Sequence, residues 1–315
     1  MDKTGFTAYL EGKGLAKATQ NEYVSNTNLF FNWAKKEDIQ VTKPDVLRYL
    51  EHLKSKKRVQ NITRKNHLIA LNHYFAFLYE AEQITENPCL LLKIRGTNKR
   101  KLHKIYTPEE LDGLFDAYYQ LFVRGYDDSH HRHEGQRYYS ALYRGRNALI
   151  VSILFNQGTN TTEIEKIELN DVDLMKATLK LRGGTRLNER TLPLKASQIG
   201  LFMHYLQQIR PKLTEYQTKE SDKLFLPLPA ISYKKTENDM TRGIFTSLSA
   251  QMKTIDKQFF NFQQVRASVI TFWIKTHGLR KAQQLAGHRY ITSTEKYLPN
   301  DLDDLTDDIN KLHPF

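Results

Sequence analysis

The sequence has only one cysteine, nine prolines and fifteen glycines among its 315 residues. The lone Cys89 excludes an internal disulfide framework and a cysteine-rich zinc site. No stretch approaches the roughly 18 consecutive apolar residues that a membrane span requires. Residues 1–14 also lack the basic start and apolar segment of a signal peptide. We therefore expect a cytoplasmic protein with no membrane partner.

Acidic residues are outnumbered: 35 Asp and Glu stand against 47 Lys and Arg, which gives a formal net charge of +12. Such an excess favours a polyanionic partner, because binding releases condensed counterions, and nucleic acid is the first candidate. A hydrophobic fraction of 40% and a charged fraction of 26% are typical of a globular protein. The length favours two domains over one.

The pattern of residues 1–90 predicts a compact domain of four helices. Thr19 and Glu22 have the spacing of a capping box and predict the start of the second helix. Thr42 followed by Pro44 predicts the start of the third helix. The fourth helix is indicated by apolar residues spaced 3, 4 and 3 apart, namely Leu68, Leu71, Phe75 and Leu78.

Basic residues gather in two places, for which a solvated surface and a phosphate-contacting surface are both open interpretations. The first group lies between the third and fourth helices and comprises Lys56, Lys57, Arg58, Arg64 and Lys65. The second lies in residues 91–104, which follow Asn87-Pro88 and predict an interdomain linker; it includes Lys99, Arg100 and Lys101. We regard both groups as candidate DNA-binding residues.

Residues 105–315 predict a second domain that is mainly helical with a small antiparallel β element. Thr107-Pro108 with Glu110 predicts its first helix start. Alternating polarity over 178–182 and an extended run over 190–194, separated by the Gly183-Gly184 turn, predict a hairpin. The polar segment 127–136 carries His130, His131 and His133, which we expect to be solvated rather than metal-bound, because no fourth ligand is evident.

The residues that carry chemistry lie near the C-terminus. We expect Arg266 near the start of a helix whose buried face comprises Val265, Val269, Phe272 and Trp273. An arginine beside a hydrophobic core needs an anion, and its planar fork suits phosphate. His288 follows an Ala-Gly pair at an expected helix end, and Tyr297 comes nine residues later. Because a tyrosine with a pKa of about 10 is a poor nucleophile, such a site needs positive donors on the phosphate.

These motifs together resemble the tyrosine recombinase (phage integrase) family. The family ends in His-x-x-Arg, Leu-Gly-His and a tyrosine, where this sequence has Gln263-Gln264-Val265-Arg266, Ala286-Gly287-His288 and Tyr297. The segment 158–174 is similar to the family's Gly-Leu-Arg-x-x-Glu-Leu and Asp-Asp turn, with Gly158, Glu163, Asp171 and Asp173 in register. The run ERTLPL resembles the end of the family's lysine hairpin. The resemblance implies a helical, SAM-like core-binding domain at 1–90 and a tyrosine-recombinase catalytic domain at 105–315.

The resemblance further implies a site-specific DNA recombinase or integrase. Tyr297 would attack double-stranded DNA and form a 3′-phosphotyrosyl bond, with no metal or other cofactor. Arg266 and His288 would stabilise the transition state, Gln263 would bind a nonbridging oxygen, and Arg186 would supply a missing charge. The family also implies a homo-oligomer, a tetramer on DNA. The acidic tail, with Leu302, Leu305 and Ile309 on one helical face, would dock on a neighbouring protomer.

Three positions depart from the family pattern. Asn160 stands where the first arginine is expected, Gln263 replaces a histidine, and the hairpin lysine has no clear counterpart. Charge from Arg186 or Arg182, or from Arg144 or Arg146, is a candidate replacement. The departures leave a second hypothesis open, in which the chain is a catalytically impaired DNA-binding accessory or regulatory protein of a mobile element.

Overall fold

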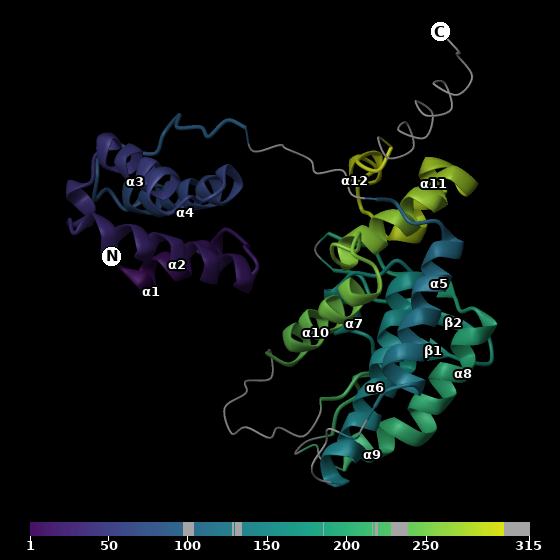
Figure 1. The fold of residues 1–315 in the computed structure, drawn as a ribbon. Coiled ribbons are helices and arrows are strands. Elements are labelled where there is room, and N and C mark those ends of the chain that lie inside the picture. Colours follow the sequence, from purple (N-terminus) through teal and green to yellow (C-terminus); the bar gives the residue numbers. More distant parts are fainter. Residues whose placement is uncertain are drawn as a thin grey trace. The chain divides into compact units, whose positions relative to one another are not determined.

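The protein divides into two compact units, Met1–Lys101 and Leu102–Phe315. The computed structural model describes residues 1–96, 104–127, 129, 134–184, 186–215, 217, 220–227 and 239–298. The first unit is coloured purple to blue in Figure 1, and the second runs from teal to yellow. The basic residues 99–101, the histidines 130, 131 and 133, and the tail 299–315 lie outside the described residues.

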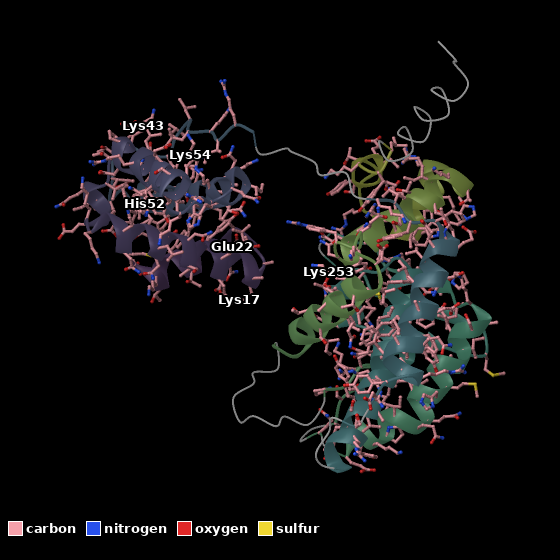
Figure 2. The ribbon with its side chains drawn as sticks, in the orientation of Figure 1. Lys17, Glu22, Lys43, His52, Lys54 and Lys253 are labelled. Carbon is pink, nitrogen blue, oxygen red and sulfur yellow. The ribbon has the colours of Figure 1, made fainter. Side chains whose placement is uncertain are left out.

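Over its described residues, 1–96, the first unit contains four helices, as predicted: α1 (Lys3–Gly12), α2 (Lys17–Ala34), α3 (Lys43–Ser55) and α4 (Asn61–Glu80), with a 3₁₀ turn at Asp38–Gln40. The predicted start of α2 is wrong. The helix already begins at Lys17 after Ala16, which provides no side-chain cap. Glu22 instead accepts a hydrogen bond from Asn66 of α4 at 3.3 Å, and its side chain is labelled in Figure 2. Glu22 therefore joins α2 to α4 instead of capping the start of α2.

The predicted start of α3 is confirmed by a capping box. The Asp45 carboxylate accepts hydrogen bonds from the Thr42 amide at 2.9 Å and from the Thr42 hydroxyl at 2.8 Å, and Pro44 lies in the first turn. Asp45 is buried and also contacts Lys36 at 3.0 Å and Arg48 at 2.5 Å. These cations and the Thr42 hydrogen bonds outweigh desolvation and hold the pKa of Asp45 well below its usual range.

Aromatic side chains dominate the core of the first unit. The ring of Phe30 meets that of Tyr49 edge-on at 5.1 Å, and Phe6 meets Tyr74 at 5.0 Å. The four predicted α4 residues, Leu68, Leu71, Phe75 and Leu78, are all buried in this core. Cys89 is buried there too, and its burial raises the pKa of the thiol to about 12. Such a thiol is a packing group rather than a nucleophile.

Helices also dominate the second unit. They are α5 (Pro108–Tyr119), α6 (Glu134–Asn156), α7 (Thr161–Ile164), α8 (Ala196–His204), α9 (Arg210–Thr214), α10 (Asp239–Ile255), α11 (Phe262–Ala286) and α12 (Thr292–Glu295). Two π turns, Gln120–Arg124 and Tyr205–Ile209, follow α5 and α8. The start of α5 is confirmed, because Thr107 and Glu110 form the predicted capping box. None of the helices among the described residues is long and apolar enough to cross a membrane.

The predicted hairpin is confirmed and belongs to a three-stranded antiparallel sheet. Its order is β1 (Val172–Asp173), β2 (Thr178–Leu181) and β3 (Arg190–Pro193). Leu179 pairs with Leu192, and Leu181 pairs with Arg190. The side chains of these four residues are all buried on one face of the sheet. The sheet thus brings an arginine into the interior beside α11, which contacts β3.

The core of the second unit is built around α6, which contacts α5, α8 and α11. Its residues Leu149, Val151, Ile153 and Leu154 are fully buried. From α11, Val265 and Val269 enter this core as predicted. Phe272 does not, since it is 39% exposed. The buried face of α11 instead continues through Thr271 and Ile274, so the assignment of Phe272 to that face is wrong.

Candidate active site

The site is built on the start of the short helix α7. The Asn160 side chain accepts a hydrogen bond from the Glu163 amide at 2.8 Å, and the Glu163 carboxylate accepts one from the Asn160 amide at 2.9 Å. Thr162 also donates to Asn160 at 2.7 Å. Asn160, which stands at the expected arginine position, therefore caps α7 and holds Glu163 in a buried position.

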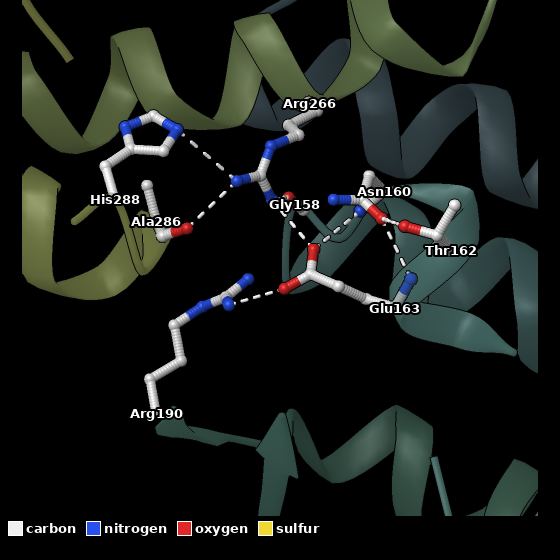
Figure 3. A network of polar contacts seen from close by, with 8 residues as sticks. All are labelled: Gly158, Asn160, Thr162, Glu163, Arg190, Arg266, Ala286 and His288. Atoms are coloured by element: carbon white, nitrogen blue, oxygen red, sulfur yellow. Dashed lines mark hydrogen bonds and ion pairs between the residues drawn. The ribbon is translucent and has the colours of Figure 1, made fainter. Parts of the chain in front are cut away.

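Glu163 receives two guanidinium groups from distant parts of the chain (Figure 3). Nη1 of Arg190, from β3, lies 2.5 Å from one carboxylate oxygen, and Nη1 of Arg266, from α11, lies 3.2 Å from the other. The three side chains are at most 8% exposed. Two cations on one buried anion leave the cluster with a formal charge of +1, which favours binding of a further anion.

Arg266 is held from two further directions. Nη1 donates to the Gly158 carbonyl, and Nη2 donates to the Ala286 carbonyl at 2.9 Å. Gly158 has a φ of +53°, and a Cβ there would lie 2.9 Å from Val269. Burial lowers the pKa of Arg266 while Glu163 raises it, and an arginine stays charged at neutral pH. The carbonyl groups of the loop at Gly158 and of the last residue of α11 thus hold a permanent charge in place.

His288 lies against both Arg266 and Tyr297. Its Nε2 is 3.4 Å from Arg266 Nη2, and its Nδ1 is 2.9 Å from the buried hydroxyl of Thr294. Because a guanidinium only donates, Nε2 carries the lone pair and Nδ1 donates its proton to Thr294. Burial first, and then Arg266 and Arg190, lower the pKa of His288 to about 4. The imidazole is therefore neutral at pH 7.

Tyr297 follows α12 and is partly buried. Its ring stacks on the His288 ring with centroids 5.9 Å apart and an interplanar angle of 9°. Gly287, the C-cap of α11, adopts a φ of +71° and turns the chain toward α12. A Cβ at Gly287 would lie 2.6 Å from Arg190 Nη1, so this turn needs glycine both for its backbone conformation and for space.

These residues surround a cleft of about 600 Å³. All five residues predicted as catalytic line it: Arg186, Gln263, Arg266, His288 and Tyr297. The wall also includes Asn160, Thr162, Glu163, Lys166, Arg182, Gly183, Gly184 and Leu187. Gln263 is exposed to the cleft, whereas its neighbour Gln264 is buried and donates to the Lys104 carbonyl at 2.9 Å.

The candidate replacements for the missing charge lie in different places. Arg182 lines the cleft but is bound by Asp171 at 2.9 Å and Glu168 at 2.6 Å. Arg146 is buried elsewhere and donates to the Leu226 carbonyl at 2.8 Å. Arg144 lies 4.3 Å from the Tyr126 ring, and neither it nor Arg146 lines the cleft. Arg186 is exposed in the cleft wall.

Sequence reasoning missed Lys166 and Arg190. Lys166 lies three residues after Glu163. This spacing predicts that the two side chains lie on the same side of a helical turn, so the sequence could have placed Lys166 near the site. Arg190 occupies an inward position of β3, two residues before Leu192. That alternation marked it as buried and therefore in need of a carboxylate, although no local pattern identified Glu163 as the partner.

The candidate DNA-binding residues of the first unit lie after α3 and in the first turns of α4. Lys56, Lys57, Arg58 and Lys65 are exposed. Arg64 is half-buried and donates to the Leu50 carbonyl and to Asn61, each at 3.0 Å, so it joins α3 to α4. Among the described residues, no group of histidine, cysteine or carboxylate side chains is arranged to hold a metal ion.

We predict that His288 makes the stability of the protein depend on pH. Its pKa is about 6.5 in an unfolded chain and about 4 in the folded one. Between these values only the unfolded chain takes up the proton, so stability falls as the pH is lowered from 6.5 to 4. The expected loss is about 3 kcal/mol, at roughly 1.4 kcal/mol for each unit of pKa difference. Urea unfolding followed by Trp273 fluorescence in a Trp33→Phe background measures it, because Trp33 belongs to the other unit. His288→Gln in the same background is the variant that lacks the titrating group. Parallel pH profiles of the two proteins would contradict this assignment.

The sequence matches two family models. The phage integrase N-terminal SAM-like domain matches residues 4–84, and the phage integrase family matches residues 136–303. The tyrosine recombinase XerC of Natranaerobius thermophilus is 25% identical over 98% of this chain and 97% of that protein. XerC of Oceanobacillus iheyensis is 25% identical over 98% of this chain and 94% of that protein.

Solved structures with a similar fold include the XerH site-specific recombinase bound to palindromic difH substrate in a post-cleavage complex. It has a TM-score of 0.65 at 18% identity, over 96% of this chain and 82% of that one. A lambda integrase dimer bound to a COC′ core site has a TM-score of 0.58 at 12% identity, over 93% of this chain and 92% of that one. The expected SAM-like and catalytic domains are thus confirmed, and the chain belongs to the phage integrase family.

Proposed function

We propose that this protein is a site-specific DNA recombinase that breaks and rejoins double-stranded DNA through Tyr297. One observation carries the proposal: Tyr297 stacks on His288 in a cleft that also presents Arg266. A tyrosine, a histidine and a buried cation around one cleft suit attack on a phosphodiester. Family membership and the likeness to XerC proteins support it. With DNA as the substrate, we propose the cytoplasm as its place of action.

In the proposed reaction the Tyr297 oxygen attacks phosphorus and forms a 3′-phosphotyrosyl bond. The bond to the 5′ oxygen breaks, and that oxygen leaves as a hydroxyl. The neutral imidazole of His288 takes the phenolic proton. Attack by a 5′ hydroxyl on the phosphotyrosyl bond reverses each step, so the covalent link conserves the bond energy and the reaction consumes no ATP.

Positive charge stabilises the phosphorane in this proposal. Arg266 binds its nonbridging oxygens, since its position and charge are fixed by Glu163 and two carbonyl groups. Gln263, exposed in the cleft, donates a neutral hydrogen bond to the same oxygens. Arg186 supplies a mobile charge from the loop between β2 and β3. Asn160 adds no charge, because it is neutral and caps α7.

The first test is formation of a covalent adduct. Wild-type protein incubated with a nicked suicide substrate should become linked to DNA, because the released 5′ fragment diffuses away before religation. Tyr297→Phe should bind the same DNA but form no adduct, as seen on a denaturing gel with labelled DNA. An undiminished adduct with Tyr297→Phe would refute the assignment. Sequence-specific binding by a wild-type protein that forms no adduct would instead indicate the accessory role.

We propose that the exposed basic residues of the first unit, and those at 99–101, contact DNA phosphates. Each lost phosphate contact should reduce the slope of log affinity against log salt by roughly 0.9. The triple variant Lys56→Gln, Lys57→Gln, Lys65→Gln should therefore bind more weakly at low salt and with a shallower slope. A second triple variant, in which Lys99, Arg100 and Lys101 are replaced, should show the same weaker binding and shallower slope. The control is Lys17→Gln, an exposed α2 lysine paired with Glu11 at 3.1 Å. Equal slopes for the wild type and the triple variants would argue against these contacts.

We also propose that the protein acts as a tetramer on DNA, with its acidic tail docked on a neighbouring protomer. A lambda integrase of similar fold was solved as a tetramer bound to a Holliday junction. The apolar tail residues Leu302, Leu305 and Ile309 would make the contact. A chain that ends at Asn300 should bind a single half-site normally but lose DNA-dependent assembly, as measured by light scattering. A full-length variant with serine at these three positions removes the apolar contact without shortening the chain. Unchanged assembly of both variants would exclude docking by the tail.

A further inference from the structure

Lys166 is the one lysine among the described residues that line the cleft. It follows Glu163 by three residues, and its amide donates to the Glu163 carbonyl at 3.0 Å. Residues with this spacing lie on the same side of a helical turn. The segment that holds Arg266 through Glu163 thus also brings an ammonium group to the cleft wall.

The ammonium group of Lys166 is not committed to a carboxylate. Lys166 is exposed, and it makes no salt bridge within the part of the chain that the structure describes. Arg182, on the same wall, is bound by Asp171 and Glu168. The Nζ atom lies next to the loop between β2 and β3, since it is 3.6 Å from the position of a Cβ at Gly184. It is therefore available to a group that enters the cleft.

The proposed cleavage needs a proton donor for the leaving 5′ oxygen, because an alkoxide is a poor leaving group. The arginines of the cleft do not serve, since a guanidinium keeps its proton at any physiological pH. The neutral His288 accepts the proton of Tyr297 and has none to spare. An ammonium group is a competent general acid at neutral pH. Among the described lining residues, this leaves Lys166.

We propose that Lys166 is the general acid of this active site, an inference that rests on the proposed function. As the phosphorus–oxygen bond breaks, the Lys166 ammonium gives a proton to the 5′ oxygen and becomes a neutral amine. The 5′ strand leaves as an alcohol while His288 holds the phenolic proton. On religation the amine takes the proton from the attacking 5′ hydroxyl, and His288 returns its proton to Tyr297. The two transfers cancel over a cleavage and religation cycle.

The decisive experiment changes the leaving group. A second suicide substrate carries sulfur in place of the bridging 5′ oxygen, because a thiol of pKa near 8.5 leaves as a thiolate without protonation. Lys166→Ala should cleave the oxygen substrate about 10²–10⁴-fold more slowly than wild type. The same variant should cleave the sulfur substrate at close to the wild-type rate. Adduct formation is followed with time at saturating DNA.

Two further variants separate proton transfer from charge. Lys166→Arg keeps the positive charge but not the acid, so it should be slow on oxygen and restored on sulfur. Arg186→Ala removes only charge and should be slow on both substrates. Lys180→Ala is the matched control, because Lys180 pairs with Glu189 at 3.0 Å and does not line the cleft. It should match wild type on both. Thermal melting of each variant monitors folding.

The proposal is overturned if Lys166→Ala cleaves the oxygen substrate at the wild-type rate. It is equally overturned if sulfur fails to restore the variant, because a lysine that only binds phosphate or supports the fold slows both substrates alike. Failure of the proposed function is a separate outcome, since the wild-type protein would then form no Tyr297 adduct with either substrate.

Discussion

The rest of the site depends on the ion pairs that the Glu163 carboxylate makes with two buried arginines. Helix α7 has only four residues and cannot fix an active site by itself. Glu163 ties it to α11 through Arg266 and to β3 through Arg190. Removal of the carboxylate would leave two buried guanidinium groups without their counter-ion, which is far more costly than the loss of an exposed ion pair. The three elements are therefore held together by one anion.

The position of Tyr297 follows from this arrangement. The Arg266 guanidinium donates to the Ala286 carbonyl at the end of α11, where Gly287 turns the chain. The loop before β3 joins the same turn, since the Asn188 amide donates to the Gly287 carbonyl at 2.7 Å. His288 is thereby placed between the guanidinium and the tyrosine ring. Burial and the adjacent cations keep its imidazole neutral, which is the state required to accept a proton.

In the proposed reaction, the departures from the family pattern redistribute roles within the cleft. Asn160 gives no charge but caps α7, so the position still serves to orient Glu163. Gln263 remains at the cleft with a neutral donor. Positive charge comes from Arg266, supported by Arg186 and Lys166 in the same cleft. The chemistry is thus spread over residues whose proximity depends on the fold rather than on one contiguous motif.

The sequence by itself determined the features that depend on local spacing. These features were the start of α3 at Thr42, the hairpin, and the grouping of Arg266 and Tyr297 in one site. Caps, turns and strand alternation are short-range, so they can be recognised without the fold. Only the tertiary structure decided which charges are free. In the folded chain Arg182 is bound by two carboxylates, whereas Lys166 lines the cleft without a salt bridge among the described residues. The pairing of charges depends on which distant segments meet in space, and no local sequence pattern records that.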